Sequence, residues 1–100
     1  MDLGTATAHT FLPHRGSQFH LVRAGSDDAL LRLEEVTSGG RQPGAPRAEP
    51  FSLVFVGSSE PILAQGTYRV GHGELGEFEI FLVPIGIAAD GGVRYEAVFN

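Results

Sequence analysis

The chain has 100 residues, of which 42% are hydrophobic and 14 are glycine, and its formal net charge is −5. This length and composition predict a single globular domain, residues 1–100, with an ordinary hydrophobic core. The negative charge repels a polyphosphate backbone, and the absence of cysteine excludes disulfides and a thiolate nucleophile. Neither nucleic acid nor cysteine chemistry is therefore expected.

Apolar residues in the first part of the chain recur mostly with period two, between clusters of Gly, Pro and Asp. This pattern is typical of short strands joined by turns. Residues 7–12 are expected to form a first strand, and residues 19–23 a second strand after the turn at residues 13–16.

Residues 29–38, ALLRLEEVTS, fit two patterns. A spacing of three places Leu30, Leu33 and Val36 on one side of a helix, whereas a period of two places Leu31 and Leu33 on one face of a strand. We favour the strand because strand patterns flank the segment on both sides. A helix here would add one short helix to the fold without changing its class.

Residues 38–50, SGGRQPGAPRAEP, combine Gly, Pro and Arg and contain no large apolar residue. Such a segment cannot bury a core face, so we expect one long flexible loop. Loops of this length are uncommon inside compact domains and often carry function.

The second half of the chain contains four further candidate strands. They lie at residues 51–56, 65–70, 77–83 and 93–99. The first is apolar on both faces, which indicates a central strand or one between two sheets, while Pro84 and Gly86 are expected either to end regular pairing or to mark a bulge between them. About seven strands joined by mostly short turns predict an all-β fold, either a small antiparallel β-barrel or a sandwich.

Four histidines raise the question of a metal site. His9, His14, His20 and His72 form no H-x-x-x-H pair on a helix and no coupled H-x-H pair on a strand. We expect exposed or hydrogen-bonded imidazoles, with no metal and no cofactor.

Candidate catalytic patterns have simpler structural explanations. Residues 56–60, VGSSE, lack the G-x-S-x-G motif of a nucleophile elbow and are expected to cap a turn. Glu77 and Glu79 share one face of a strand, where Arg94, which lies next to Glu96 on the same face across the next hairpin, is expected to supply counter-charge on a solvated surface. No catalytic residue is therefore predicted.

A G-x-G-x-x-G pattern occurs at Gly71, Gly73 and Gly76. In dinucleotide-binding proteins this pattern opens a helix, but here the strand-like sequence FEIFLV follows. We interpret these glycines as turn residues, so the sequence predicts neither a nucleotide cofactor nor an enzyme.

The longest apolar run, residues 80–89, is far shorter than the ~20 residues that span a bilayer. The N-terminal residues also lack the basic and apolar regions of a signal peptide. We expect no membrane association and a location in the cytoplasm or in an assembled particle.

Five segments of the sequence together resemble a family of short bacterial domains of unknown function. They are FLPHRGSQF (11–19), PFSLVF (50–55), QGTYRV (65–70), GEFEIFLVP (76–84) and YEAVFN (95–100). The resemblance covers nearly the whole chain except the loop at residues 38–49. Members of this family are frequent in actinobacteria and their relatives and are sometimes encoded near phage-tail or tail-collar-like proteins. The resemblance implies an assembly role and supplies no catalytic residues.

The main functional hypothesis is a non-enzymatic module that binds a protein partner or a second copy of itself. One candidate contact surface is the long loop with Arg41 and Arg47. The other is the apolar face of the last hairpin that carries Phe81, Val83 and Val98. The period of two places these three residues opposite a second apolar set, consisting of Phe78, Ile80, Leu82, Tyr95 and Phe99.

An alternative function is binding of a small molecule or a carbohydrate at the mouth of a barrel. Tyr68, Tyr95 and His72 are the polar aromatic residues available for such a site. Two tyrosines and no tryptophan leave few platforms on which a sugar can stack.

Overall fold

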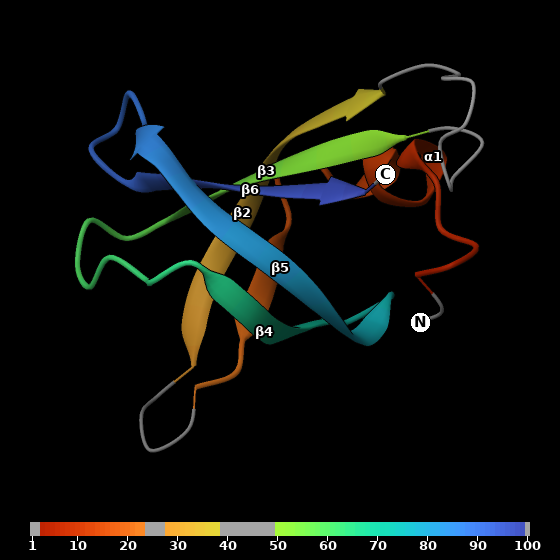
Figure 1. Ribbon diagram of the computed structural model, residues 1–100, viewed down its shortest axis with the longest axis horizontal. Helices are drawn as coiled ribbons and strands as arrows, with labels where there is room; N and C mark the ends of the chain where they lie inside the picture. Colours follow the sequence, from red (N-terminus) through yellow and green to blue (C-terminus); the bar gives the residue numbers. More distant parts are fainter. Residues whose placement is uncertain (1–2, 24–27, 39–49, 100) are drawn as a thin grey trace.

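The computed structural model describes residues 3–23, 28–38 and 50–99. Their secondary structure is one short α-helix, one 3₁₀-helix and six strands (Figure 1). In chain order the elements are α1 (Ala8–Phe11), η1 (Leu12–His14), β1 (Gln18–Leu21), β2 (Ala29–Ser38), β3 (Phe51–Gly57), β4 (Gly66–His72), β5 (Gly76–Ile87) and β6 (Val93–Phe99).

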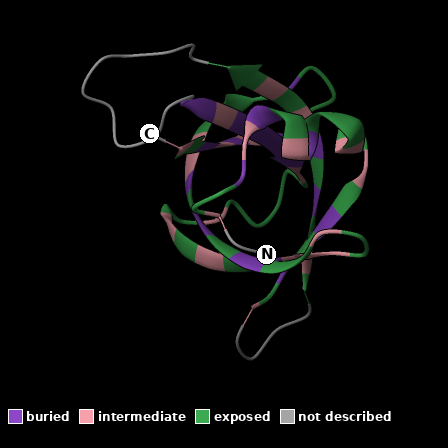
Figure 2. Ribbon diagram, turned by 90° about the vertical axis from the view of Figure 1, so that its right-hand side faces the viewer, coloured by how far each residue is buried: buried purple, intermediate pink, exposed green. Residues whose placement is uncertain are grey.

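The six strands form a closed antiparallel barrel in the order β1-β2-β3-β6-β5-β4. Seen from the end that carries α1, the strands make a ring with buried residues distributed along its walls (Figure 2). The barrel confirms the predicted all-β class. β3 lies between β2 and β6, as predicted for a strand that is apolar on both faces.

The first predicted strand, residues 7–12, is wrong because this segment folds as helix. Ala8 and Phe11 are both buried, and their spacing of three places them on the same side of a helical turn. The turn is closed at its start, where the backbone N–H of Thr7 donates to Oγ1 of Thr10 at 3.1 Å. Pro13 then continues the chain into η1, since proline fits the first turn of a helix.

The short helix α1 closes one end of the barrel. The ring of Phe11 is fully buried and lies within 5.8 to 6.2 Å, centroid to centroid, of the rings of Phe51, Phe78 and Phe99. Phe51 and Phe99 stack on each other at 4.5 Å. Because these rings come from β3, β5 and β6, the helix joins three strands that are distant in sequence.

Residues 29–38 form a strand, as we favoured, and this strand contains a bulge. Leu31 and Leu33 point inward and are buried, and the register with β3 shifts between Leu33 and Glu35. The extra residue at the shift turns both Glu34 and Glu35 toward the outside and returns Val36 to the core side.

β5 is longer than predicted, and it changes its partner along its length. Its first part pairs with β4 up to Leu82, and its second part pairs with β6 from Val83 onward. The predicted bulge is confirmed, because the register with β6 shifts between Pro84 and Gly86. Pairing continues past the bulge to Ile87, so the strand does not end at Pro84.

The loop at residues 58–65 lies at the end of the barrel opposite α1 (left in Figure 1). Tyr95, which points inward from β6, holds this loop by accepting the backbone N–H of Leu63 at its hydroxyl (2.9 Å). Tyr68 also holds it by donating to the carbonyl of Ala64 (2.6 Å). Both tyrosines therefore fasten the loop to the barrel wall.

We predict that Phe11→Ala destabilises the fold by about 3–5 kcal/mol, because it removes a fully buried ring that three strands share. Equilibrium unfolding in urea measures this change. Leu12→Ala is the matched control, since the next residue is exposed and its truncation should cost less than about 0.5 kcal/mol. Equal effects of the two substitutions would show that α1 does not close the barrel.

Candidate functional site

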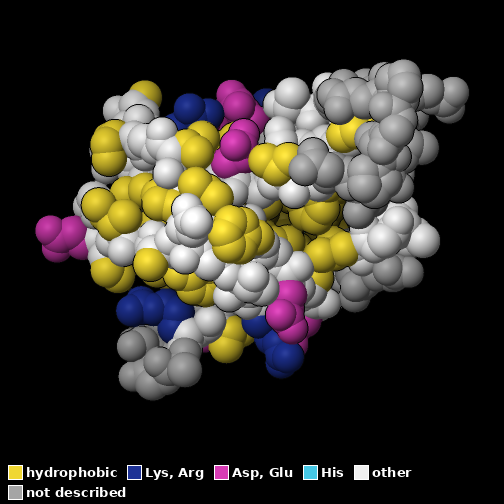
Figure 3. All heavy atoms as spheres, in the orientation of Figure 1, with side chains coloured by type: hydrophobic (Ala, Val, Ile, Leu, Met, Phe, Trp, Pro, Cys, Tyr) yellow, Lys and Arg dark blue, Asp and Glu magenta, His cyan; other side chains and the backbone are white. Residues whose placement is uncertain are grey.

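The exposed side of the last hairpin carries a group of apolar side chains, which we call the outer apolar face. It consists of Phe81, Val83, Ile85 and Val98. Phe81 and Val98 expose 50% and 57% of their surface. Figure 3 shows hydrophobic side chains gathered over β5 on this side of the molecule, with charged side chains beside them.

The register of β5 with β6 explains why Phe81, Val83 and Val98 share one side. Val83 pairs with Glu96, whose side chain points outward, and Phe81 and Val98 each lie two residues away along their own strands. Ile87 pairs instead with the buried Val93 and so lies on the other side of the hairpin, although 67% of it is exposed.

The opposite apolar set lies on the core side, as the alternation predicted. Phe78, Ile80, Leu82 and Tyr95 are buried, and Phe99 packs against the core cluster. The outer apolar face therefore consists of side chains that the core of this chain does not use. Arg41 and Arg47, the two candidates in the long loop, lie outside the described residues.

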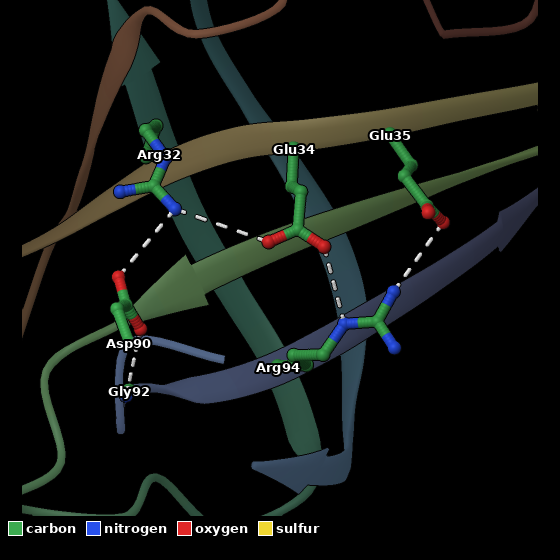
Figure 4. A network of polar contacts seen from close by, with 6 residues as sticks. All are labelled: Arg32, Glu34, Glu35, Asp90, Gly92 and Arg94. Carbon is green, nitrogen blue, oxygen red and sulfur yellow. Dashed lines mark hydrogen bonds and ion pairs between the residues drawn. The ribbon is translucent and has the colours of Figure 1, made fainter. Parts of the chain in front are cut away.

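A network of ion pairs lies beside this face, over β3. Nε and Nη2 of Arg94 on β6 lie 3.3 Å from Glu34 and 3.4 Å from Glu35, both on β2. Figure 4 shows the side chain of Glu34 reaching across β3 toward Arg94. The bulge in β2 makes this possible, because it turns both carboxylates outward.

The network continues to Arg32, which lies 3.9 Å from Glu34 and 3.7 Å from Asp90. Beneath it, two outward-pointing residues of β3, Val54 and Val56, are only 5% exposed. The long arginine and glutamate side chains thus shield apolar surface of β3 from water with their aliphatic parts.

The predicted counter-charge for Glu77 and Glu79 comes from a different strand. Arg69 of β4 lies 3.7 Å from Glu77 and is the register partner of Glu79. Arg94 pairs with β2 instead, because β5 reaches β6 only from Val83 onward. The expected pairing across the β5–β6 hairpin is therefore wrong.

His72 and Ser17 form a polar contact near the α1 end of the barrel that sequence spacing did not indicate. Nδ1 of His72 accepts the backbone N–H groups of Glu74 and Leu75 at 3.1 and 3.3 Å, so the ring carries its proton on Nε2. Nε2 lies 3.1 Å from Oγ of Ser17, and this hydroxyl donates to the carbonyl of His14 at 2.6 Å.

These donor and acceptor roles argue against a nucleophilic Ser17. A serine nucleophile needs an imidazole that accepts its hydroxyl proton, whereas Oγ of Ser17 accepts from His72 and donates to a carbonyl. The contact instead fixes the turn that contains Gly73 and Gly76, and Gly76 has the positive φ (80°) expected of a turn glycine. Ser58 has a similar role, since its hydroxyl donates to the carbonyl of Glu60 at 2.7 Å.

Burial lowers the pKa of His72 below its usual value of 6.5. The neighbouring His14 and His20 lower this pKa further, and Glu74 opposes the shift. The rings of His14 and His72 lie 4.7 Å apart, and Nδ1 of His14 lies 4.0 Å from Glu74. His72 is thus held in its neutral form, which the two backbone donors require.

Within the residues that the structure describes, no group of three His, Cys, Asp or Glu side chains is placed to hold a metal ion. His9 is exposed on α1, and His20 is exposed on β1. The three residues of the alternative ligand site also do not converge. Tyr68 and Tyr95 bond to the loop before β4, whereas His72 lies at the end of that strand.

A family model for a domain of unknown function, DUF6916, matches residues 6–99. The chain belongs to the DUF6916 family. The match includes α1 and all six strands of the barrel, so the barrel is the DUF6916 domain. This agrees with the resemblance to short domains of unknown function. No curated protein and no solved structure matches the DUF6916 chain.

In the part of the DUF6916 domain that the structure describes, no helix is long and apolar enough to cross a membrane. Ser17 was not predicted as a partner of His72 because the two residues are 55 positions apart in the sequence. Only closure of the barrel, which pairs β1 with β4, brings them together.

We predict that the free energy of unfolding of the wild-type protein falls as the pH drops below about 6.5. The unfolded chain, in which His72 has its ordinary pKa, binds the proton before the folded chain does, so stability is lost down to the lower folded pKa. His72→Gln should remove this component, as measured by urea unfolding between about pH 5 and pH 7. His9→Gln is the control and should keep the wild-type dependence, and an unchanged dependence in His72→Gln would contradict the assignment.

We predict that Arg94→Ala destabilises the fold by about 1 kcal/mol, because it uncovers Val54 and Val56 and leaves Glu34 and Glu35 without their shared cation. Arg94→Met should recover part of this loss, since it restores the aliphatic cover without the charge. Urea unfolding at low and high salt separates the two contributions.

Arg69→Ala is the control for the Arg94 substitutions. Its ion pair with Glu77 is mostly exposed, so its loss should stay within about 0.5 kcal/mol. A loss at Arg69 as large as that at Arg94 would show that the network over β3 has no special role.

Proposed function

We propose that the protein is a non-catalytic structural module that works by protein–protein contact, and that its outer apolar face packs against the same face of a second copy. The observation that carries this proposal is the exposure of Phe81 and Val98 on one side of the β5–β6 hairpin. Apolar side chains grouped in this way are typical of interaction surfaces.

The contact uses the face of β5 rather than its edge. The edge of residues 83–87 that points away from β6 has no partner strand among the described residues, since β4 pairing ends at Leu82. Pro84 lacks a backbone N–H, however, so this edge cannot form a continuous ladder with another strand. Side-chain packing of Phe81, Val83 and Ile85 is therefore the better basis for association.

Charge restricts where a second copy can dock. The chain has a net charge of −5, so two copies repel each other over most of their surfaces. Residues 80–89 of β5 and its following turn contain no charged side chain, so two copies meet there without direct charge repulsion, while Glu96 of β6 lies beside Val83 at the border of this uncharged stretch. A two-fold axis places the same face on both partners.

The length of β5 is sufficient for an interface of this kind. A stable interface buries about 800 Å² on each partner, which is about a seventh of the 5756 Å² surface of this chain. β5 has 12 residues and is therefore about 40 Å long. A contact along β5 that includes Val98 of β6 extends far enough to bury such an area.

The dimer serves as a component of a phage-tail-like or other multi-protein assembly, in the cytoplasm or in the assembled particle. This part of the proposal is supported by the resemblance to short bacterial domains encoded near phage-tail proteins. The non-catalytic part of the proposal is supported by the roles of Ser17 and His72, because the hydroxyl donates to a carbonyl and its hydrogen bonds fix a turn.

Size-exclusion chromatography with light scattering over a wide concentration range tests this function. We expect a mass of twice the 10.6 kDa chain for the wild type, and a monomer for Phe81→Glu and Val98→Glu, because two buried carboxylates would face each other in the dimer. Ile87→Glu is the matched control, since Ile87 is more exposed than either but lies on the other side of the hairpin.

A wild type that stays monomeric at every concentration would overturn the self-association. Dissociation by Ile87→Glu as complete as that by Phe81→Glu would overturn the assignment of the face. Chromatography with the products of neighbouring genes tests the assembly role, which requires that at least one of them co-elutes with the wild type and not with Phe81→Glu.

A further inference from the structure

A pocket of about 320 Å³ opens at the end of the barrel opposite α1. It lies between the start of β2, the end of β3 and the loop at residues 58–65, and Leu31 and Tyr95 contribute to its lining. This volume is at the small end of the range for ligand pockets, so it suits a ligand smaller than a typical drug molecule. The pocket is separate from the outer apolar face, whose residues do not line it.

The lining includes Tyr95, whose hydroxyl has one hydrogen-bonding position left for a ligand. Tyr95 is 1% exposed, and its hydroxyl oxygen accepts the N–H of Leu63. Its own O–H finds no acceptor among the residues that the structure describes. The hydroxyl can therefore donate a hydrogen bond to an acceptor that a ligand supplies.

The pocket also carries charges of both signs. Its lining contains the guanidinium of Arg23 and the carboxylates of Asp28 and Glu60. None of the three forms an ion pair within the described part of the chain. By contrast, charged side chains such as Arg94 form ion pairs with residues of other strands. These three are thus available to a ligand.

The apolar part of the lining is formed by leucines and a proline, at Leu30, Leu31, Pro61 and Leu63. Leu30 is among the exposed large hydrophobic residues of the chain, although it adjoins the pocket. A ligand with an apolar portion would cover it and gain burial energy.

From these features we infer that the pocket binds a small zwitterion of the α-amino acid class with an apolar side chain. The ligand carboxylate accepts from Arg23 and from the hydroxyl of Tyr95, and the ligand ammonium donates to Glu60 and Asp28. The ligand side chain packs against Leu30 and its apolar neighbours. The proposal does not depend on self-association, because it uses none of the residues of the outer apolar face.

Other ligand classes fit the pocket less well. A phosphate ester carries two negative charges and would be repelled by Asp28 and Glu60. A purely apolar ligand would desolvate the three charges and the hydroxyl of Tyr95 without replacing their hydrogen bonds. A neutral sugar can bond to all of these groups, but it gains nothing from the opposite charges, and it is therefore the discriminating competitor.

Isothermal titration calorimetry on the full chain tests the inference with L-leucine as the probe. L-leucinol lacks the carboxylate, N-acetyl-L-leucine lacks the ammonium, and D-glucose represents the neutral sugars. We expect L-leucine to bind, each of the two leucine derivatives to bind about tenfold or more weakly, and D-glucose not to bind. Equal binding of leucine and its derivatives, binding of glucose alone, or no binding of L-leucine would overturn the inference.

Substitutions locate the site. Arg23→Gln and Glu60→Gln should each weaken L-leucine binding about tenfold or more, because each removes one charged partner. Tyr95→Phe keeps the ring and should also weaken binding, with its folding checked by circular dichroism, since the hydroxyl also holds Leu63. Arg15→Gln, an exposed arginine near the other end of the barrel, should bind as the wild type does. Unchanged affinity in Arg23→Gln would place any observed binding outside this pocket.

Discussion

The structure depends on the change of partner within β5. Every strand of a closed barrel pairs with two neighbours, but β5, unlike β3, does so with separate parts of its length, first with β4 and then with β6. The bulge between Pro84 and Gly86 lets the strand continue along β6. The resulting hairpin carries two apolar outer residues, Phe81 and Ile85, that face water in the single chain.

The two ends of the barrel are closed by different kinds of contact. At one end the ring of Phe11 joins three strands through aromatic packing, and His72 fixes the neighbouring turn as a neutral hydrogen-bond acceptor. At the other end the hydroxyl of Tyr95 holds a loop, and charged residues such as Arg23 and Glu60 lie around it without forming ion pairs in the described part of the chain. At the first end the side chains of Phe11 and His72 find their partners within the chain. At the second end the charged groups and the hydroxyl of Tyr95 retain hydrogen-bonding capacity for the proposed ligand.

Local patterns predicted the six observed strands, together with a seventh that is a helix, but they did not predict the contacts between strands. Residues 51–56 and 93–99 alternate clearly, so their strands and their buried faces followed from period two alone. The segment 7–12 is too short to distinguish two periods, and its helix depends on Phe11 packing against distant strands. The partner of Arg94 was missed for a related reason, since it depends on a bulge in β2 and on the order of strands around the barrel.

Strand β6 connects the two proposed sites and also keeps them independent. Its alternate side chains point to opposite sides of the barrel wall, so Tyr95 reaches the pocket while Val98 reaches the outer apolar face. Between these two surfaces lies a core whose largest side chains are fully buried, which leaves little room for one side to adjust to a change on the other. A partner on the outer face and a small ligand in the pocket can therefore occupy the same barrel together, and neither requires the backbone of β6 to move.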